Sequence, residues 1–165
     1  MDDDLIDALI AEWGATRPDF DTSGMEVVGR IIMLGHLMSI SASDVLKIHN
    51  ISYTDFDILA TLCRQGPPYA LTPSVLSRAV LLTSGAMTTA LDRLERAGLI
   101  TRRPSEEDRR SSVVSLTPRG RSTAEKAAVD RFGDAASWVA DMPAEKRQRL
   151  AELLKSIITN PDRPA

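Results

Sequence analysis

The sequence predicts a mainly α-helical (α+β) fold, and three observations predict it. Residues 84–97 form a compact helical pattern that stops at Gly98. Two short β-type runs follow, at 99–102 and 113–116, with a strongly charged turn between them. Apolar residues at helical spacing fill much of the chain on either side. A small helix with a hydroxyl-rich start, followed by a hairpin with a basic tip, is typical of a winged helix-turn-helix, here flanked by further helices.

Two helices are expected in residues 1–50. The first is a short amphipathic helix over 4–15, which the sequence Arg17-Pro18-Asp19 ends. The second, over 24–50, is apolar around most of its circumference. This breadth indicates burial on more than one side, as expected for a helix inside a dimer.

Capping signals divide the middle of the chain into three helices before the hairpin. Ser52-x-x-Asp55 is a capping-box start, and a glycine with two prolines stops the helix behind it. Thr72-Pro73 places a cap before a proline at the first helical turn, so a helix of about two turns should cover 73–80. Thr83 can cap the next helix.

Two further helices are expected after the hairpin. Thr117-Pro118 repeats the cap-and-proline pattern and opens a helix that reaches Trp138, and Met142-Pro143 starts the last helix. The helices at both ends of the chain are too apolar to stay solvated, so we expect them to pack together and against a second copy. The expected division is a dimerisation lobe built from residues 1–50 and 118–165 and a winged helix-turn-helix lobe built from 51–117.

Charge is distributed unevenly along a chain whose net charge is −3. From Arg64 to Arg121 there are ten arginines, no lysine and five acidic residues, a net charge of +5, so the remainder carries −8. Attraction to phosphate is local, because salt screens it within about 10 Å. The basic middle therefore favours DNA despite the acidic total.

Composition also indicates where the chain works. No apolar run is expected to reach the roughly 18 residues of a membrane span. The three aspartates near the start do not resemble a signal peptide. Cys63 is the only cysteine, which excludes an internal disulfide and a cysteine-cluster metal site. We therefore expect a cytoplasmic protein without a membrane partner, a cofactor or a metal.

The predicted reading helix has one apolar face and one polar face. On the polar face, Thr88 and Thr89 can hydrogen-bond base edges or phosphates, and Arg93, one turn further on, is better placed for a phosphate. Taken alone, this face could equally be a solvated surface with an Asp92–Arg96 pair. The hairpin beside it favours DNA.

The hairpin tip and the preceding short helix supply further candidates. Arg109 and Arg110 can insert into a narrow minor groove, where the negative potential is enhanced, and Asp108 can orient one of them. Hydroxyl and arginine side chains of the short helix could contact backbone phosphates. The predicted DNA-binding set is Ser74, Arg78, Ser84, Thr88, Thr89, Arg93, Asp108, Arg109 and Arg110.

These motifs together resemble the MarR family of bacterial transcriptional regulators. The resemblance rests on residues 53–59, on Leu71-Thr72-Pro73, on 91–100, and on Asp108-Arg109-Arg110 with the strand that follows. It implies a triangular α+β homodimer that binds pseudo-palindromic operators on double-stranded DNA and often represses a neighbouring gene.

The front of the chain is similar to the urate-responsive, PecS-like branch, which has an added N-terminal helix. In that branch, the added helix, the helix before the DNA-reading pair and the wing each contribute a residue to a ligand pocket. The matching positions are Trp13, Asp57 and Arg102. A further arginine of the branch falls on Ala90, which counts against urate itself. The residues alone also allow simpler roles, with Trp13 in the core and Asp57 in a structural ion pair with Arg102.

The expected function is that of a ligand-responsive, sequence-specific DNA-binding transcriptional regulator, with repression as its expected output. It should release its operator on binding a small aromatic or anionic effector, such as a urate-like compound or a phenolic acid. Two alternatives remain: a non-specific nucleoid-associated DNA-binding protein, and a helical protein-interaction module. Nucleotide-binding loops, zinc-protease motifs and nucleophile elbows are absent from the sequence, so an enzyme is not expected.

Overall fold

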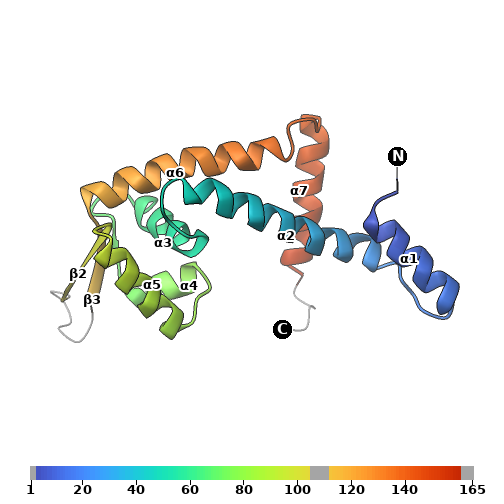
Figure 1. Cartoon of the computed structure of the whole chain (residues 1–165), viewed down its shortest axis with the longest axis horizontal. Helices are drawn as coiled ribbons and strands as arrows, with labels where there is room; N and C mark the ends of the chain where they lie inside the picture. Colours follow the sequence, from blue (N-terminus) through green and yellow to red (C-terminus); the bar gives the residue numbers. More distant parts are fainter. Residues whose placement is uncertain (1–2, 105–111, 161–165) are drawn as a thin grey trace.

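The computed structural model describes residues 3–104 and 112–160 and confirms a mainly helical fold with a small antiparallel sheet. The helices are α1 (Leu5–Thr16), α2 (Met25–Lys47), α3 (Tyr53–Cys63), α4 (Pro73–Ala79), α5 (Ser84–Arg96), α6 (Pro118–Ser137) and α7 (Ala144–Ile158). In Figure 1 the two long helices, α2 and α6, lie side by side. They connect a compact lobe that contains α3, α4, α5 and the strands to the terminal helices α1 and α7.

The helices begin where the capping signals predict. The Ser52 hydroxyl and the Asp55 carboxylate exchange hydrogen bonds with each other's backbone N–H groups at 3.1 and 3.0 Å, which completes the predicted capping box of α3. The Thr83 and Thr117 hydroxyls cap α5 and α6. Thr72 stands at the cap position of α4, but its hydroxyl contacts the Ser74 hydroxyl instead of a backbone donor.

The sheet has three strands in the order β1-β3-β2. β2 (Ile100–Pro104) and β3 (Ser112–Leu116) form the predicted antiparallel pair, with Arg102 opposite Val114. β1 (Ala70–Leu71) pairs with the other edge of β3 and was not predicted. A strand of two residues cannot show the alternation by which strands are detected in a sequence.

A single apolar core holds α3, α4, α5 and the sheet together and receives the start of α6. The four residues of the predicted apolar face of α5 are at most 2 % exposed. Burying a large aliphatic side chain contributes about 1.5–3 kcal/mol, so this face alone fixes the rotation of α5 about its axis. These residues are Met87, Ala90, Leu91 and Leu94.

Most of α2 is exposed in the single chain, including Val27, Ile31 and Leu34. By length and mean hydropathy alone, α2 passes as long and apolar enough to cross a membrane, although Arg30, Gly35 and His36 interrupt its apolar run. The same apolar side chains border a groove of about 670 Å³ between α2 and α7. A helix that is apolar around most of its circumference is expected to be buried, whether within protein or within a membrane.

Candidate nucleic-acid interface and effector cavity

The amino-terminal half of α5 presents small and hydroxyl-bearing side chains to solvent. Ser84, Thr88 and Thr89 are exposed. The Thr88 hydroxyl donates to the Ser84 carbonyl at 3.0 Å, and the Thr89 hydroxyl donates to the Gly85 carbonyl at 3.1 Å. Each hydroxyl hydrogen is therefore used within the helix, which leaves oxygen lone pairs and methyl groups outward. Such a surface can accept from base amino groups and contact thymine methyls.

The stretch of chain that forms this surface carries no carboxylate. From Thr72 to Leu91, across α4 and the first half of α5, the one charged residue is Arg78. Arg78 and Ser74, both on α4, are exposed. Phosphate groups would meet no repulsion from this stretch, and a cation and hydroxyls lie on the same short helix. The structure thus presents the predicted phosphate-contacting and base-contacting residues on adjacent helices.

Arg93 has a partner in another helix. Its Nε and Nη2 donate to the Asp55 carboxylate of α3 at 2.7–3.1 Å, and Asp55 is only 4 % exposed. The hydrogen bond to Asp55 raises the pKa of the Arg93 guanidinium above its ordinary value. The expected phosphate contact of Arg93 stays a prediction, but its guanidinium is already paired.

Arg102 joins β2 to α5. Its Nη2 lies 2.6 Å from Glu95 Oε2 and 2.7 Å from Asp92 Oδ1, and its backbone N–H donates to Glu95 at 3.1 Å. The Arg102 guanidinium lowers the pKa of Glu95. The simple Asp92–Arg96 pair is not what forms, because Arg96 instead donates to the Asp92 carbonyl. Nor does Arg102 pair with Asp57.

The predicted wing-tip residues Asp108, Arg109 and Arg110 lie outside the described residues. The strands that lead to and from them are in place, with Pro104 opposite Ser112 as the last described pair. Their predicted groove contacts therefore stay predictions.

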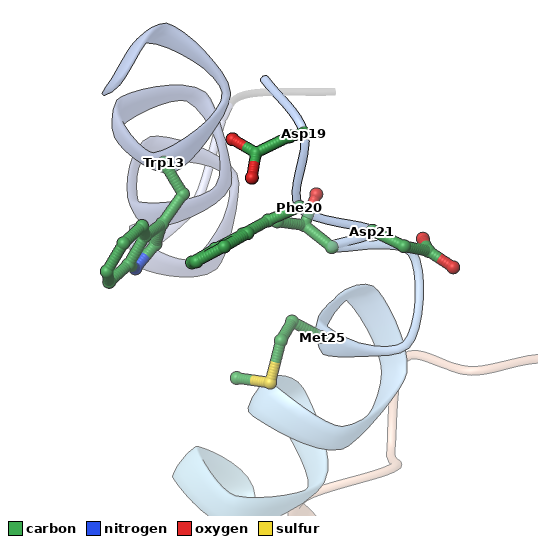
Figure 2. Close-up of a pocket in the computed structure, with 6 residues that line it drawn as sticks. Trp13, Asp19, Phe20, Asp21 and Met25 are labelled. Atoms are coloured by element: carbon green, nitrogen blue, oxygen red, sulfur yellow. The ribbon is translucent and has the colours of Figure 1, made fainter. Parts of the chain in front are cut away.

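The three residues of the predicted ligand pocket are not brought together within one chain. Trp13 belongs to α1, at the opposite end of the molecule from α3 and the wing (Figure 1). Its ring packs against Phe20, 5.7 Å between centroids, above a hollow of about 440 Å³ that Met25 also borders (Figure 2). Trp13 is 50 % exposed, so it is not a core residue of the single chain.

A second hollow, of about 250 Å³, lies where α2, α3 and α6 meet. It is lined by Met38 and Ser39 of α2, Tyr53 of α3 and Arg131 of α6. Arg131 also donates to Asp134 at 3.1 Å, and both side chains are largely buried. Sequence reasoning did not select Arg131, because an arginine three residues before an aspartate on a helix is typical of an ordinary surface pair.

The pKa of Asp57 is shifted by its burial and by nearby arginines, among them Arg131 of this hollow. Burial raises its pKa, while the positive charges of Arg64 and Arg131 oppose that rise. Because its pKa is higher in the folded protein than in the unfolded chain, protonated Asp57 favours the folded state. This contribution to the free energy of unfolding is present below the unfolded-state pKa and is lost as pH rises through the folded-state pKa. The ionised Asp57 carboxylate is therefore a destabilising element of the fold at neutral pH.

Replacing Asp57 with asparagine should raise the urea midpoint at pH 7 and lose that advantage on acidification, since both proteins are then uncharged at this position. Urea denaturation at pH 7 and pH 3.5 measures the difference. Asp44→Asn, at an exposed aspartate paired with Lys47, is the control that removes a charge without relieving burial. A midpoint gain at pH 3.5 equal to that at pH 7 would contradict the assignment.

Relatives of the chain decide its family. The MarR family model matches residues 49–111, which run from just before α3 through the predicted wing tip at 108–110. The HTH-type transcriptional regulator PecS of Dickeya dadantii is 38 % identical over 115 residues, which covers 70 % of this chain and 69 % of PecS. The chain belongs to the MarR family. The likeness to PecS supports the predicted branch of that family.

Solved structures agree with this MarR fold. AbsC of Streptomyces coelicolor has a TM-score of 0.76 at 21 % identity and covers 84 % of this chain and 94 % of its own. A mutant MarR of E. coli in complex with operator DNA has a TM-score of 0.70 at 23 % identity, covering 94 % and 99 %. NadR in complex with 4-hydroxyphenylacetate has a TM-score of 0.64 at 22 % identity, covering 81 % and 93 %. The chain is a MarR-family DNA-binding transcriptional regulator.

Proposed function

We propose that this regulator is a sequence-specific repressor that binds a pseudo-palindromic operator as a homodimer and releases it when a small aromatic or anionic effector binds. The observation that carries the proposal is the carboxylate-free, hydroxyl-rich surface of α4 and the first half of α5. Its MarR relatives are transcriptional regulators rather than enzymes. The proposed place of action is the bacterial cytoplasm.

In the proposed complex, α5 enters the major groove. Ser84, Thr88 and Thr89 would contact base edges, while Ser74 and Arg78 would contact phosphates. The wing tip at 108–110 would reach the minor groove. Removing an arginine that contacts only phosphate lowers affinity for all sequences. Removing a threonine that reads a base changes which sequence is preferred.

A second copy would cover the apolar groove between α2 and α7. Its lining is almost wholly apolar, and Ile31, Leu150 and Leu153 are more than a third exposed in the single chain. Covering these side chains would extend the buried apolar surface across both copies. Two reading helices would then be spaced by about one duplex turn, roughly 34 Å.

The hollow between α2, α3 and α6 fits the proposed effector. Arg131 supplies a cation, Tyr53 a phenol and Met38 an adaptable apolar wall, which together match a small aromatic acid. NadR, which shares the fold, is solved with 4-hydroxyphenylacetate. A urate-like ligand on Trp13, Asp57 and Arg102 remains the second possibility, and that site would need Trp13 to come from a second copy.

An effector at this hollow must favour one arrangement of the lobes. The hollow lies between the long helices and α3, so its occupancy can distinguish two positions of the DNA lobe. A ligand with equal affinity for both positions would shift nothing. Release of DNA therefore requires that the effector bind better to the spacing that does not fit the operator.

Selection of duplexes from a random pool by the purified protein tests the proposed function. Enrichment of one inverted-repeat sequence is expected. Binding without enrichment would favour the nucleoid alternative, and no binding to any duplex would favour the interaction module.

Arg78→Gln should weaken binding to the selected operator and to random duplex alike. The slope of log affinity against log salt should fall by about 0.9, the value of one phosphate contact. Fluorescence anisotropy at several salt concentrations measures this slope. Arg149→Gln, which removes an exposed arginine on α7, should leave the slope unchanged. Equal slopes for the two variants would remove Arg78 from the interface.

Arg131→Gln should weaken effector response about tenfold or more, since a hydrogen bond to a charged group contributes about 1.5–3 kcal/mol. A thermal-shift screen with salicylate, 4-hydroxyphenylacetate, urate and xanthine identifies ligands, and DNA release at rising ligand concentration gives the response. Arg149→Gln again serves as the charge control. If Trp13→Ala abolishes the response while Arg131→Gln does not, the urate-like site is the correct one.

A further inference from the structure

Two ion-pair clusters join the side chains of α5 to other elements within the described residues. One links Glu95 and Asp92 to Arg102 of β2, and the other links Arg93 to Asp55 of α3. The remaining polar contacts given for exposed α5 side chains, those of the threonines and Arg96, end on the helix's own carbonyls. The orientation of α5 relative to α3 thus depends on the apolar core and on Arg93.

The Asp55 carboxylate is buried, and both of its oxygens are engaged by Ser52 or Arg93. Its side chain is 5 % exposed, and it accepts from the Ser52 backbone at 3.0 Å and from the Ser52 hydroxyl at 2.8 Å while holding Arg93 at 2.7 Å. Arg93 also lies 3.4 Å from that hydroxyl. A phosphate that withdrew Arg93 would leave a buried carboxylate without its cation, which is strongly unfavourable.

We propose that Arg93 is a positioning residue, whose ion pair with Asp55 sets the angle of the reading helix from the first turn of α3, and that it is not a phosphate contact. The proposal rests on the proposed function, because it concerns how α5 is presented to an operator. The same first turn of α3 contributes Tyr53 to the effector hollow, so the hollow and the ion pair share one element.

The two roles of Arg93 predict opposite effects for Asp55→Asn. If Arg93 contacts phosphate, removing a nearby negative charge should leave DNA binding equal or tighter. If Arg93 positions α5, the same substitution should weaken binding to the selected operator, because the link between α3 and α5 is lost. The neutral amide keeps an oxygen that can accept from Ser52, so the start of α3 is retained.

The test is a double-mutant cycle on the full-length protein with the selected operator, read by anisotropy at several salt concentrations. Arg93→Gln and Asp55→Asn should each weaken binding about tenfold, and the double variant should be no weaker than either. The salt slope should stay that of the parent. Arg96→Gln, one turn further along α5 with no link to another element among the described residues, is the matched control and should change affinity little.

Three results would overturn the proposal: tighter or equal binding by Asp55→Asn, a salt slope flattened by about 0.9 in Arg93→Gln, or additive losses in the double variant. Circular dichroism establishes that each variant is folded, and the half-exposed Arg93 keeps Arg93→Gln usable if Asp55→Asn is not. Failure of the parent to bind any duplex is a separate result, which removes the proposed function itself.

Discussion

Replacing Gly120 with alanine should lower the free energy of unfolding by about 3 kcal/mol, at the upper end of overpacking costs. A Cβ at this position would lie 1.8 Å from the Leu99 carbonyl oxygen and 2.7 Å from its carbonyl carbon. Both are backbone atoms, so no side-chain rotation can relieve the clash. The start of α6 would have to move away from the strand that leads into the wing.

That movement would break the contacts that hold the start of α6 against the turn between α5 and β2. Leu99 accepts a hydrogen bond from the Thr117 backbone at 3.1 Å, and the Thr117 hydroxyl donates to Gly98 at 2.8 Å. Urea denaturation measures the loss. Gly133→Ala is the matched control on the same helix, because nothing lies within 4 Å of its added Cβ.

The control should have the opposite sign. Alanine stabilises a helix interior by roughly 0.5–1 kcal/mol relative to glycine, so Gly133→Ala should raise the free energy of unfolding. Equal losses for the two variants would show that α6 responds to any added methyl group, and the proposed clash with Leu99 would then be wrong.

Leu153→Glu should convert the proposed dimer into a monomer and weaken operator binding by at least about 100-fold, because two linked reading helices bind with an avidity that one cannot reach. Leu153 lines the groove between α2 and α7 and is 48 % exposed in the single chain. The substitution therefore places a charge at the proposed interface between copies without unpacking the core of α3, α4 and α5.

Sedimentation velocity and operator titration test this together. Ile48→Glu changes an apolar side chain that is 74 % exposed at the other end of α2 and does not line the groove. That control should stay dimeric and keep its affinity. A Leu153→Glu protein that remains dimeric would place the interface elsewhere, and a monomer with undiminished affinity would separate DNA binding from dimerisation.

Local signals allowed much of the fold to be predicted. The capping box of α3 and the caps of α5 and α6 depend on residues three apart, and the apolar face of α5 depends on helical spacing. β1 escaped prediction because its two residues become a strand only when β3 lies beside them.

The partners of the site residues could not be predicted in this way. Arg93 and Asp55 are 38 residues apart, and Arg102 selects Glu95 and Asp92 rather than Asp57 because β2 runs along α5. The hollow proposed for the effector depends on the crossing of α2, α3 and α6, which no short pattern encodes. Spacing within one helix predicts which residues share a face. The ion-pair partner of a side chain on another helix or strand is known only once the packing of these elements is known.

The bond between Arg102 and the carboxyl-terminal half of α5 has a consequence for how the protein leaves its operator. Tilting the hairpin relative to α5 would have to break the ion pairs of Arg102, in the middle of β2, with Glu95 and Asp92. A small swing of one lobe would therefore misalign the proposed major-groove contacts and the proposed minor-groove contacts together. We expect dissociation to pass through few half-released states, because the two sets of proposed contacts would be lost together.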